Sequence, residues 1–449
     1  MTGQALPLWR QLQAAASVLQ SVREGVSATA ALTRIDGAVR AAAQALAFQT
    51  LRNLGRAEAL RVLLAKRPPP PQADALLCVA LALCWRDQDA PYEPFTLVDQ
   101  AVEAAKLNSA TRAQSNFINA CLRRFLRERE ALVAATDRQP VAFWNHPQWW
   151  IKRLKNDHPR HWQQILEANN TQPPMTLRVN LRRSTQQSYL AGAAEAGVAA
   201  APVGTQGVIL ERPRPVTEVP GFVQGHVSVQ DAAAQLAAPL LMTGLQAFDG
   251  NALRVLDACA APGGKTAHLL EITDAHVVAI DIDAERCKRI HETLERLGLQ
   301  AEVVVADAAD PARWWDKKPF DAILLDAPCT ASGIVRRHPD IRWLRRETDI
   351  AQLAALQARL LAVMWPLLAP GGRLLYCTCS VFRAEGEAQV QTFLAHHKDS
   401  VLRPGPGHLL PQSGEKTNGV PDNLAGDHDG FYYALLEKSA SLGSHPSRP

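Results

Sequence analysis

Cysteine is scarce in this chain and is not spaced as in common cysteine-based sites. The 449 residues include eight cysteines, and no two of them have C-x-x-C spacing. That spacing is typical of zinc sites and of thioredoxin-like redox motifs, so we expect neither, and we expect no bound metal. So few cysteines in a long chain indicate reduced thiols, as in a cytoplasm. The composition therefore predicts a cytoplasmic protein.

Long apolar runs are missing as well. The longest, residues 75–85, is too short to span a bilayer and is typical of a buried helix. No apolar stretch of the kind found in signal peptides follows Met1. We therefore expect no membrane-spanning segment, no contact with a membrane and no secretion signal.

The chain also lacks a strong net charge, because its 48 Lys and Arg residues exceed its 44 Asp and Glu residues by only four. A mildly basic protein can bind a polyanion such as a nucleic acid, but this balance does not require one. At 449 residues the chain is too long for one ordinary core, so a multidomain protein with two or three domains is expected.

Residues 1–142 are rich in Ala, Leu, Gln and Arg and poor in Gly. Within them, apolar residues recur with helical spacing, as at Val98, Ala101, Val102 and Ala105. A run of prolines at 68–71 separates two such helical stretches. This pattern predicts an all-α bundle.

The composition and the sequence pattern change over residues 143–235. Tryptophans become frequent, and we expect them to lie in a core. Two short β-like runs, residues 176–180 and 207–210, predict strands. We expect a small α+β module here, resembling an RNA recognition motif (RRM-like). The tail at 439–449 is rich in Ser and Pro and is expected to be disordered.

Over residues 236–438, short apolar runs alternate with helical patterns. This alternation predicts an α/β domain with a parallel sheet and helices on both of its faces, as in Rossmann-like folds. The expected strands are residues 253–256, 277–280, 301–305, 322–325 and 373–376, with helices at 284–297 and 350–368 between them.

A glycine-containing loop, residues 257–266, follows the first of these strands. Gly263 and Gly264 allow a tight turn and a close approach to a ligand, and Lys265 and Thr266 would open a helix whose free N–H groups favour an anion. The loop matches neither the G-x-x-x-x-G-K-[ST] phosphate loop nor the G-x-G-x-x-G fingerprint.

Aspartates end the strands that follow this loop. Asp281 suits the two hydroxyls of a ribose, Asp307 suits an adenine amino group, and Asp326 ends a further strand. Together they indicate an adenosine-containing ligand. The alternative is that these aspartates cap the helices that follow, and Asp283 competes with Asp281 for the ribose.

Two cysteines, Cys329 and Cys379, each follow an apolar strand at the edge where parallel sheets bind ligands. A thiolate that adds to C6 of cytosine makes C5 nucleophilic enough to take a methyl group, which is the usual gain from nucleophilic catalysis. Asp326 could contact the N3/N4 edge of such a base. Cys377 lies on the same side of an extended segment as Cys379, so the pattern does not distinguish them.

The residues before Cys329 favour carbon over nitrogen as the methyl acceptor. Enzymes that methylate amino groups generally present Asn/Asp-Pro-Pro-aromatic at the end of this strand, whereas this chain has Asp-Ala-Pro-Cys at 326–329. Four of the other five cysteines are expected to be buried small hydrophobes. They are Cys78, Cys84, Cys121 and Cys287.

Basic residues follow Cys329 closely. Arg336, Arg337, His338 and Arg342 form a compact basic loop, which is the kind of donor set that contacts phosphates. Arg123 and Arg124 form a second basic group after an apolar stripe. For both groups the alternative is a charged surface that faces solvent.

The chain resembles the RNA cytosine-5 methyltransferase family. The resemblance rests on the loop 257–266, the block 326–343 and the Thr-Cys-Ser triplet at 378–380. The N-terminal part is similar to a NusB-like RNA-binding helical domain, notably at 95–99 and 116–124. The resemblance extends over nearly the whole chain, to about residue 438.

The resemblance implies a class I methyltransferase domain that uses S-adenosyl-L-methionine. It implies Cys379 as the nucleophile and Cys329 as the residue that assists product release. The cofactor would be bound by Cys259, Ala260, Ala261, Pro262, Gly263, Gly264, Lys265, Asp281, Asp307 and Asp326. Cys377 departs from the family pattern, which often has a residue without a thiol there.

The implied substrate is 16S rRNA, naked or in an early 30S intermediate, with cytosine 967 as the target and a monomeric enzyme that does not act on DNA. Two rival functions remain at this point. One is a non-catalytic RNA-binding or antitermination factor carried by the NusB-like domain. The other is methylation of DNA or of protein.

Overall fold

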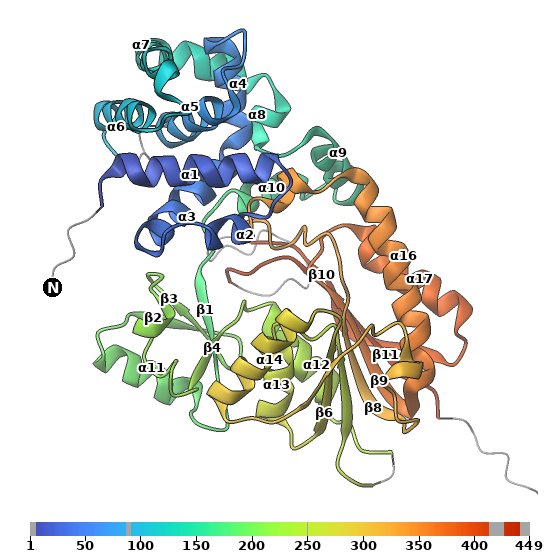
Figure 1. The fold of residues 1–449 in the computed structure, drawn as a ribbon. Coiled ribbons are helices and arrows are strands. Elements are labelled where there is room, and N and C mark those ends of the chain that lie inside the picture. Colours follow the sequence, from blue (N-terminus) through green and yellow to red (C-terminus); the bar gives the residue numbers. More distant parts are fainter. Residues whose placement is uncertain (1–5, 87–90, 249, 413–425, 441–449) are drawn as a thin grey trace, which may run out of the picture. The chain divides into compact units, whose positions relative to one another are not determined.

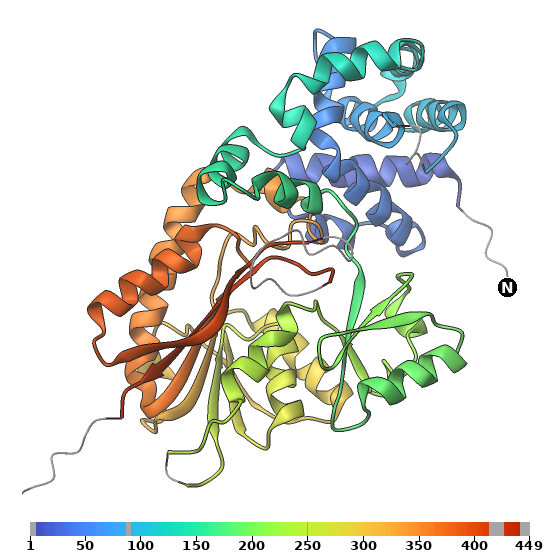
Figure 2. The same ribbon diagram turned by 180° about the vertical axis from the view of Figure 1, so that it is seen from behind.

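The computed structural model describes residues 6–86, 91–248, 250–412 and 426–440 (Figures 1 and 2). The chain divides into two compact units. The helical unit comprises Met1–Gln172 and the later segment Val335–Glu347, and the sheet unit comprises Pro173–Ile334 and Thr348–Pro449. The expected multidomain organisation is therefore present, although the chain passes between the two units more than once.

The helical unit is all-α, as predicted. Apolar faces of its helices form one core that is dominated by Ala and Leu. Its helices are α1 Leu8–Arg23, α2 Ala28–Thr33, α3 Gly37–Arg52, α4 Leu54–Leu64, α5 Pro71–Cys84, α6 Pro94–Leu107, α7 Ser115–Asp137, α8 Pro140–Trp144, α9 Gln148–Asp157, α10 Trp162–Asn169 and the short α15 Ile341–Leu344.

Helix α5 lies at the centre of this core. Every residue from 73 to 84 is buried, and Pro71 occupies the first turn, where its missing N–H is not needed. The proline run therefore ends the loop after α4, as the sequence indicates. In α6, Val98, Ala101 and Ala105 face the core, as their helical spacing predicts.

Residues 143–172 form helices that belong to the helical unit. Trp150 of α9 is fully buried, and the rings of Trp144 and Trp162 meet edge to face with centroids 5.1 Å apart. These tryptophans serve packing, as expected, but the core to which they contribute is helical. The first strand after them is β1 Met175–Val179, which overlaps the strand expected at 176–180.

The late segment Val335–Glu347 is bound to the helical unit by specific hydrogen bonds. The Asp340 carboxylate accepts from the N–H of Ala28 at 2.9 Å, and the indole N–H of Trp343 donates to the carbonyl of Leu51 at 2.8 Å. These contacts join residues about three hundred positions apart, and no local sequence pattern predicts them.

The sheet unit begins with a four-stranded antiparallel sheet in the order β2-β3-β1-β4. The strands are β1 Met175–Val179, β2 Ala200–Val203, β3 Gly207–Leu210 and β4 Val227–Val229, and α11 Gln186–Glu195 packs on them. Strands β1 and β3 lie where strands were expected. This sheet with its helix is the small α+β module.

A second sheet has seven strands in the order β10-β11-β9-β8-β5-β6-β7. The strands are β5 Arg254–Ala258, β6 His276–Asp281, β7 Glu302–Val305, β8 Phe320–Asp326, β9 Leu368–Thr378, β10 Ser400–Leu409 and β11 Phe431–Lys438. The five predicted strands, β5 to β9, are parallel to one another. Strands β10 and β11 add an antiparallel edge to the sheet, and neither strand was predicted from the sequence.

Helices cover both faces of this sheet (Figure 1). One face packs on α12 Ala237–Met242, α13 Gly264–Ile272 and α14 Ala284–Leu297. The other packs on α16 Glu347–Met364 and α17 Glu387–His396. Successive strand residues alternate between the two cores, as the strand period of two requires. The Rossmann-like α/β architecture is confirmed.

A buried ion pair joins the small sheet to a helix that packs on the large sheet. Arg178 on β1 forms two hydrogen bonds of 2.8 Å with the carboxylate of Glu271 on α13. The same guanidinium donates to the carbonyl of Gly264 at 2.9 Å. The small sheet is thus bonded directly to the glycine loop and to the helix that follows it.

Among the described residues, the segment Glu347–Leu367 alone is long and apolar enough to cross a membrane by length and composition. Core helices of soluble proteins pass the same test. Here Leu360, Leu361 and Met364 of this segment are buried in the core beneath the seven-stranded sheet. Its apolar character is explained by that packing.

Candidate active site

The predicted site residues of the sheet unit meet at one edge of the large sheet. From β5 the chain continues to β6 and β7 on one side, whereas β8 and β9 lie on the other side. Ligands of open α/β sheets bind where the strand order reverses in this way. The glycine loop follows β5, Asp326 ends β8, and Cys379 follows β9 directly.

The glycine loop has a backbone that few side chains allow. Gly263 is the N-cap of α13 and has φ 92°, in the left-handed region. A Cβ on Gly263 would lie 3.0 Å from the Cα of Ile290. Glycine is required there both by the conformation and by the closeness of α14. Cys259 also has positive φ, at 64°.

Asp257 lies below this loop and is completely buried. One carboxylate oxygen accepts from the hydroxyl of Thr266 at 2.6 Å. The other, Oδ1, has no hydrogen-bond partner within the described part of the chain. Burial raises the pKa of the Asp257 carboxyl to about 7. An orphaned oxygen of this kind can accept from a ligand held by the loop.

The other strand-end aspartates differ in their contacts. Asp281 is buried, and it accepts from the N–H of Ala261 at 3.1 Å, which joins β6 to the glycine loop. Asp283 caps α14 through the N–H groups of Glu285 and Arg286. The helix-capping alternative therefore applies to Asp283. Asp307 is exposed, two residues beyond β7.

Asp326 is held between a cation and a thiol. The ammonium of Lys265 donates to Asp326 Oδ2 at 2.6 Å, and the Cys377 thiol donates to Oδ1 at 3.5 Å. The pKa of Lys265 is raised by this carboxylate despite its burial. The pair joins the glycine loop to the end of β8, so cofactor loop and strand end share one charge network.

The thiols of Cys329 and Cys379 lie against each other, with their Sγ atoms 3.4 Å apart. Strands β8 and β9 are parallel neighbours, and Asp326 is opposite Cys377 in their register. This register carries the two loops that follow the strands to the same place. The thiol contact with Cys379, together with burial, raises the pKa of Cys329.

The structure distinguishes Cys377 from Cys379. Cys377 is fully buried, and burial together with the nearby Asp326 carboxylate raises the pKa of its thiol. Cys379 is only partly buried. Of these two, Cys379 has the more accessible sulfur. The four remaining cysteines, Cys78, Cys84, Cys121 and Cys287, are buried, as expected for small hydrophobes.

Two glycines fix the backbone behind Cys379. The N–H of Gly333 donates to the carbonyl of Cys379, and the N–H of Gly430 donates to the carbonyl of Gly333, both at 2.9 Å. A Cβ on Gly333 would lie 2.0 Å from the Gly430 carbonyl oxygen. Only glycine allows these three segments to pass so closely.

Glu385, which the sequence reading did not single out, contacts both cysteine loops. It is fully buried and accepts hydrogen bonds from Thr330, next to Cys329, and from Ser380, next to Cys379. No spacing rule identifies this residue. The one available signal is a glutamate shortly after the Thr-Cys-Ser triplet, in a stretch that turns out to be buried.

The basic loop after Cys329 does not present all its charges to solvent. Arg336 and Arg342 are fully buried in the helical unit. The Arg342 guanidinium donates to the carbonyls of Asn145 and Asn169 at 3.1 and 2.6 Å and to the side chain of Asn170 at 2.5 Å. The contacts of Arg342 and the complete burial of Arg336 correct the expectation that these two residues contact RNA.

The other expected RNA contacts are more accessible. Arg337 and His338 are half-buried, in the same segment of the helical unit. On α7, Arg123 is exposed and bonds to Asn119, and Arg124 pairs with Glu128 at 3.0 Å. Surface pairs of this kind are weak, so these arginines can exchange them for phosphates.

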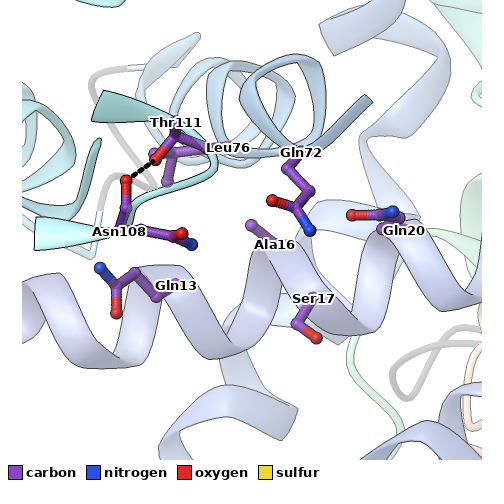
Figure 3. Close-up of a pocket in the computed structure, with 8 residues that line it drawn as sticks. All are labelled: Gln13, Ala16, Ser17, Gln20, Gln72, Leu76, Asn108 and Thr111. Carbon is purple, nitrogen blue, oxygen red and sulfur yellow. Dashed lines mark hydrogen bonds between the residues drawn. The ribbon is translucent and has the colours of Figure 1, made fainter. Parts of the chain in front are cut away.

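A small pocket lies elsewhere, in the helical unit, lined by α1, α5 and the segment that follows α6 (Figure 3). It contains none of the predicted site residues. Its lining is uncharged: Gln13, Ala16, Ser17, Gln20, Gln72, Leu76, Asn108 and Thr111. Within the described ranges no group of three or more His, Cys, Asp or Glu residues could hold a metal ion.

Comparison with known protein families divides the chain into three matched segments. Residues 4–127 match the NusB family. Residues 146–217 match the ferredoxin-like domain of RsmF/B-like methyltransferases. Residues 243–437 match the family described as 16S rRNA methyltransferase RsmB/F. This last match contains the glycine loop, the aspartates and both cysteines of the site.

Relatives that match nearly the whole chain indicate the same family. The chain is 42% identical over 444 residues to "Ribosomal RNA small subunit methyltransferase B" of Pseudomonas putida, covering 95% of this chain and 98% of that protein. It is 41% identical over 432 residues to the protein of the same name from Vibrio cholerae, covering 95% and 96%. The solved structure "Crystal Structure of PH0851" has the same fold, with 23% identity, a TM-score of 0.74 and coverage of 96% and 99%. The chain belongs to the ribosomal RNA small subunit methyltransferase B family.

Proposed function

We propose that this protein transfers a methyl group to C5 of a cytosine in small-subunit rRNA, through a covalent bond between Cys379 Sγ and C6 of the base. The observation that supports this most directly is the pair of thiols 3.4 Å apart, at the ends of neighbouring strands and at the ligand-binding edge. One base placed at this edge can be reached by both sulfurs.

The two cysteines take different roles. Cys379 has the more accessible sulfur, so it adds to C6 and makes C5 nucleophilic. After methyl transfer a base takes the proton from C5, the electrons of that C–H bond form the C5–C6 double bond, and Cys379 leaves C6 as a thiolate. Cys329, against Cys379, assists this release of the product. Contact with Cys379 and burial raise the pKa of Cys329, which disfavours its thiolate.

Asp326 contacts the N3/N4 edge of the cytosine in this proposal. The Lys265 ammonium, 2.6 Å from Oδ2, neutralises and orients the carboxylate. Within the described residues, the other oxygen, Oδ1, accepts only from the weak thiol donor of Cys377. It can therefore accept from the exocyclic amine of a base. Lys265 thus acts through Asp326 rather than on the base.

The site fits S-adenosyl-L-methionine. Carboxylates suit its hydroxyl, amino and cationic groups: the buried Asp257 has an oxygen without a partner among the described residues, Asp281 ends β6, and Asp307 follows β7. The loop 259–265 ends at the N-terminus of α13, where free N–H groups favour a carboxylate. When bound, the cofactor supplies an electrophilic methyl group.

The proposed substrate is 16S rRNA, with cytosine 967 as the target and naked RNA or an early 30S intermediate as its state. Arg337, His338, Arg123 and Arg124 supply phosphate contacts, as exposed or half-buried basic side chains do in RNA-binding surfaces. Arg336 and Arg342 are not part of this surface. We propose a monomeric enzyme of the cytoplasm that acts on RNA and not on DNA.

The test is methyl transfer from tritium-labelled S-adenosyl-L-methionine to 16S rRNA, with duplex DNA as the control substrate. Cys379→Ala should abolish transfer. Cys329→Ala should accumulate an RNA–protein adduct that survives a denaturing gel, because addition proceeds and release does not. Mass mapping of the labelled rRNA identifies the modified cytosine. Full activity in Cys379→Ala would refute the assigned roles, and no cofactor binding in calorimetry would favour a non-catalytic RNA-binding factor.

A further inference from the structure

Glu385 is a buried carboxylate whose partners are neutral. It ends the 3₁₀ turn Arg383–Glu385 and has no solvent exposure. Its side-chain hydrogen bonds within the described chain come from two hydroxyls, one backbone N–H and one side-chain amide. Burial raises its pKa. Burying a charged group without a neighbouring cation costs folding free energy. The presence of a carboxylate at this position therefore needs an explanation.

The donors to Glu385 come from both cysteine loops. Thr330 follows Cys329, and it donates its N–H to Oε1 at 2.8 Å and its hydroxyl to Oε2 at 2.5 Å. Ser380 follows Cys379, and its hydroxyl donates to the same Oε2 at 2.6 Å. One carboxylate oxygen therefore joins the residues that directly follow the two thiols.

A third contact reaches the other side of Cys329. The side-chain amide of Gln357 on α16 donates to the Pro328 carbonyl at 2.9 Å and to Glu385 Oε1 at 3.3 Å. Cys329 is thus flanked on both sides by residues whose bonds lead to Glu385. A bond of 2.9 Å between Ser332, three residues after Cys329, and Ser380, next to Cys379, is a second link between the two loops. Loss of Glu385 should therefore displace the Cys329 loop more than it unfolds the site.

We propose that Glu385 is a positioning residue that sets the distance between the Cys329 and Cys379 thiols by bridging the two loops. Bonds to an ionised carboxylate in a dry site are among the stronger hydrogen bonds in proteins. A displacement of about 1 Å at a reacting group can cost about 100-fold in rate. The effect on catalysis rests on the proposed function, whereas the effect on the thiol distance does not.

The test compares variants of Glu385 that differ in side-chain length and in charge. Glu385→Gln keeps the length of the side chain, and its amide can accept from the Thr330 N–H and donate to the two hydroxyls. Glu385→Asp keeps the charge but is one methylene shorter, so it cannot bond to both loops. A positioning role predicts that the Gln variant is the more active one. A role of the charge alone predicts the opposite order. Glu387→Ala, on the half-exposed Glu387 of α17, is the matched control.

The thiol distance is measured on the full-length protein without RNA or cofactor. Phenylarsine oxide bonds two neighbouring thiols to one arsenic atom and releases one water. We expect Glu385→Asp to slow this bridging about 10-fold and Glu385→Gln to slow it less than about 3-fold, because only the shorter side chain separates the loops. Cys329→Ser should abolish bridging, which identifies the pair. Alkylation by iodoacetamide, which needs one thiol, should change little.

In methyl transfer, Glu385→Asp should lower kcat by about 10- to 100-fold, with KM for rRNA within about 3-fold of wild type, because the chemistry and not RNA binding depends on the spacing. Wild-type bridging and wild-type kcat in a folded Glu385→Asp protein would overturn the proposal, as would a Gln variant that is less active than the Asp variant. If the wild-type protein methylates no rRNA while bridging responds as described, the proposed function fails and the positioning role stands.

Discussion

The Sγ atoms of Cys329 and Cys379 lie 3.4 Å apart, although the two residues are 50 positions apart in the sequence. To form a disulfide bond, the two sulfur atoms need to move closer together by little more than 1 Å. The parallel register of β8 and β9 creates this contact.

We therefore expect mild oxidation by hydrogen peroxide to join Cys329 and Cys379. Each thiol gives up one proton and one electron, and the peroxide is reduced to two water molecules. Activity should be lost and should return with dithiothreitol. Peptide mapping by mass spectrometry checks the pairing. Inactivation with both thiols still free, or protection from this inactivation in Cys377→Ser, would contradict this assignment.

Cys377 should be dispensable for catalysis. Its side chain is fully buried, and its thiol is a weak donor to Asp326, which Lys265 already pairs. We expect Cys377→Ala to keep kcat within about 5-fold of wild type while losing about 1 kcal/mol of unfolding free energy from the small cavity. Methyl transfer and urea unfolding measure the two effects. A loss as complete as in Cys379→Ala would show that the thiols are assigned the wrong way round.

Asp257 should make stability depend on pH. Burial raises its pKa to about 7, so the folded state holds the proton more tightly than the unfolded state does. Its contribution to stability is complete at low pH and is lost as pH rises through about 7. Between pH 5 and 8, wild type should lose about 2.7 kcal/mol of unfolding free energy relative to Asp257→Asn, at 1.36 kcal/mol for each of the two pH units below the pKa of about 7. Urea unfolding at several pH values measures the difference, and parallel pH profiles for the two proteins would contradict it.

Arg342 should matter for stability rather than for RNA binding. Its removal leaves two carbonyls and the Asn170 side chain without their buried donor. We expect Arg342→Ala to cost about 2–4 kcal/mol of unfolding free energy. The exposed Arg127 of α7 offers a matched control, with an expected cost below about 0.5 kcal/mol for Arg127→Ala.

RNA affinity provides the second measurement on Arg342. The salt dependence of binding counts phosphate contacts, and a buried guanidinium makes none. The slope of log affinity against log salt should therefore be unchanged in folded Arg342→Ala. A slope lower by about one charge would return Arg342 to the RNA-binding surface.

Much of the fold was predictable because its signals are local. Helix α14 and strand β3 begin and end where the hydrophobic pattern places them, and the proline run separates α4 from α5. Strands β10 and β11 were missed. The first is largely exposed and contains two prolines and two glycines, which weaken any strand signal.

The sequence by itself determined the chemistry that is available: a glycine loop, acids at strand ends, and a Pro-Cys and a Thr-Cys after strands. Each of these features consists of a few consecutive residues that can be recognised in the sequence. Each also follows a predicted strand, so its place at the end of that strand can be predicted as well. The tertiary structure alone decided which of these groups meet. The register of β8 with β9 brings Cys329 to Cys379 and buries Cys377, the contacts of the helical unit bury Arg342, and packing places Glu385 between two loops. Each of these outcomes depends on segments far apart in the chain, whose pairing is set by the packed core and not by neighbouring residues.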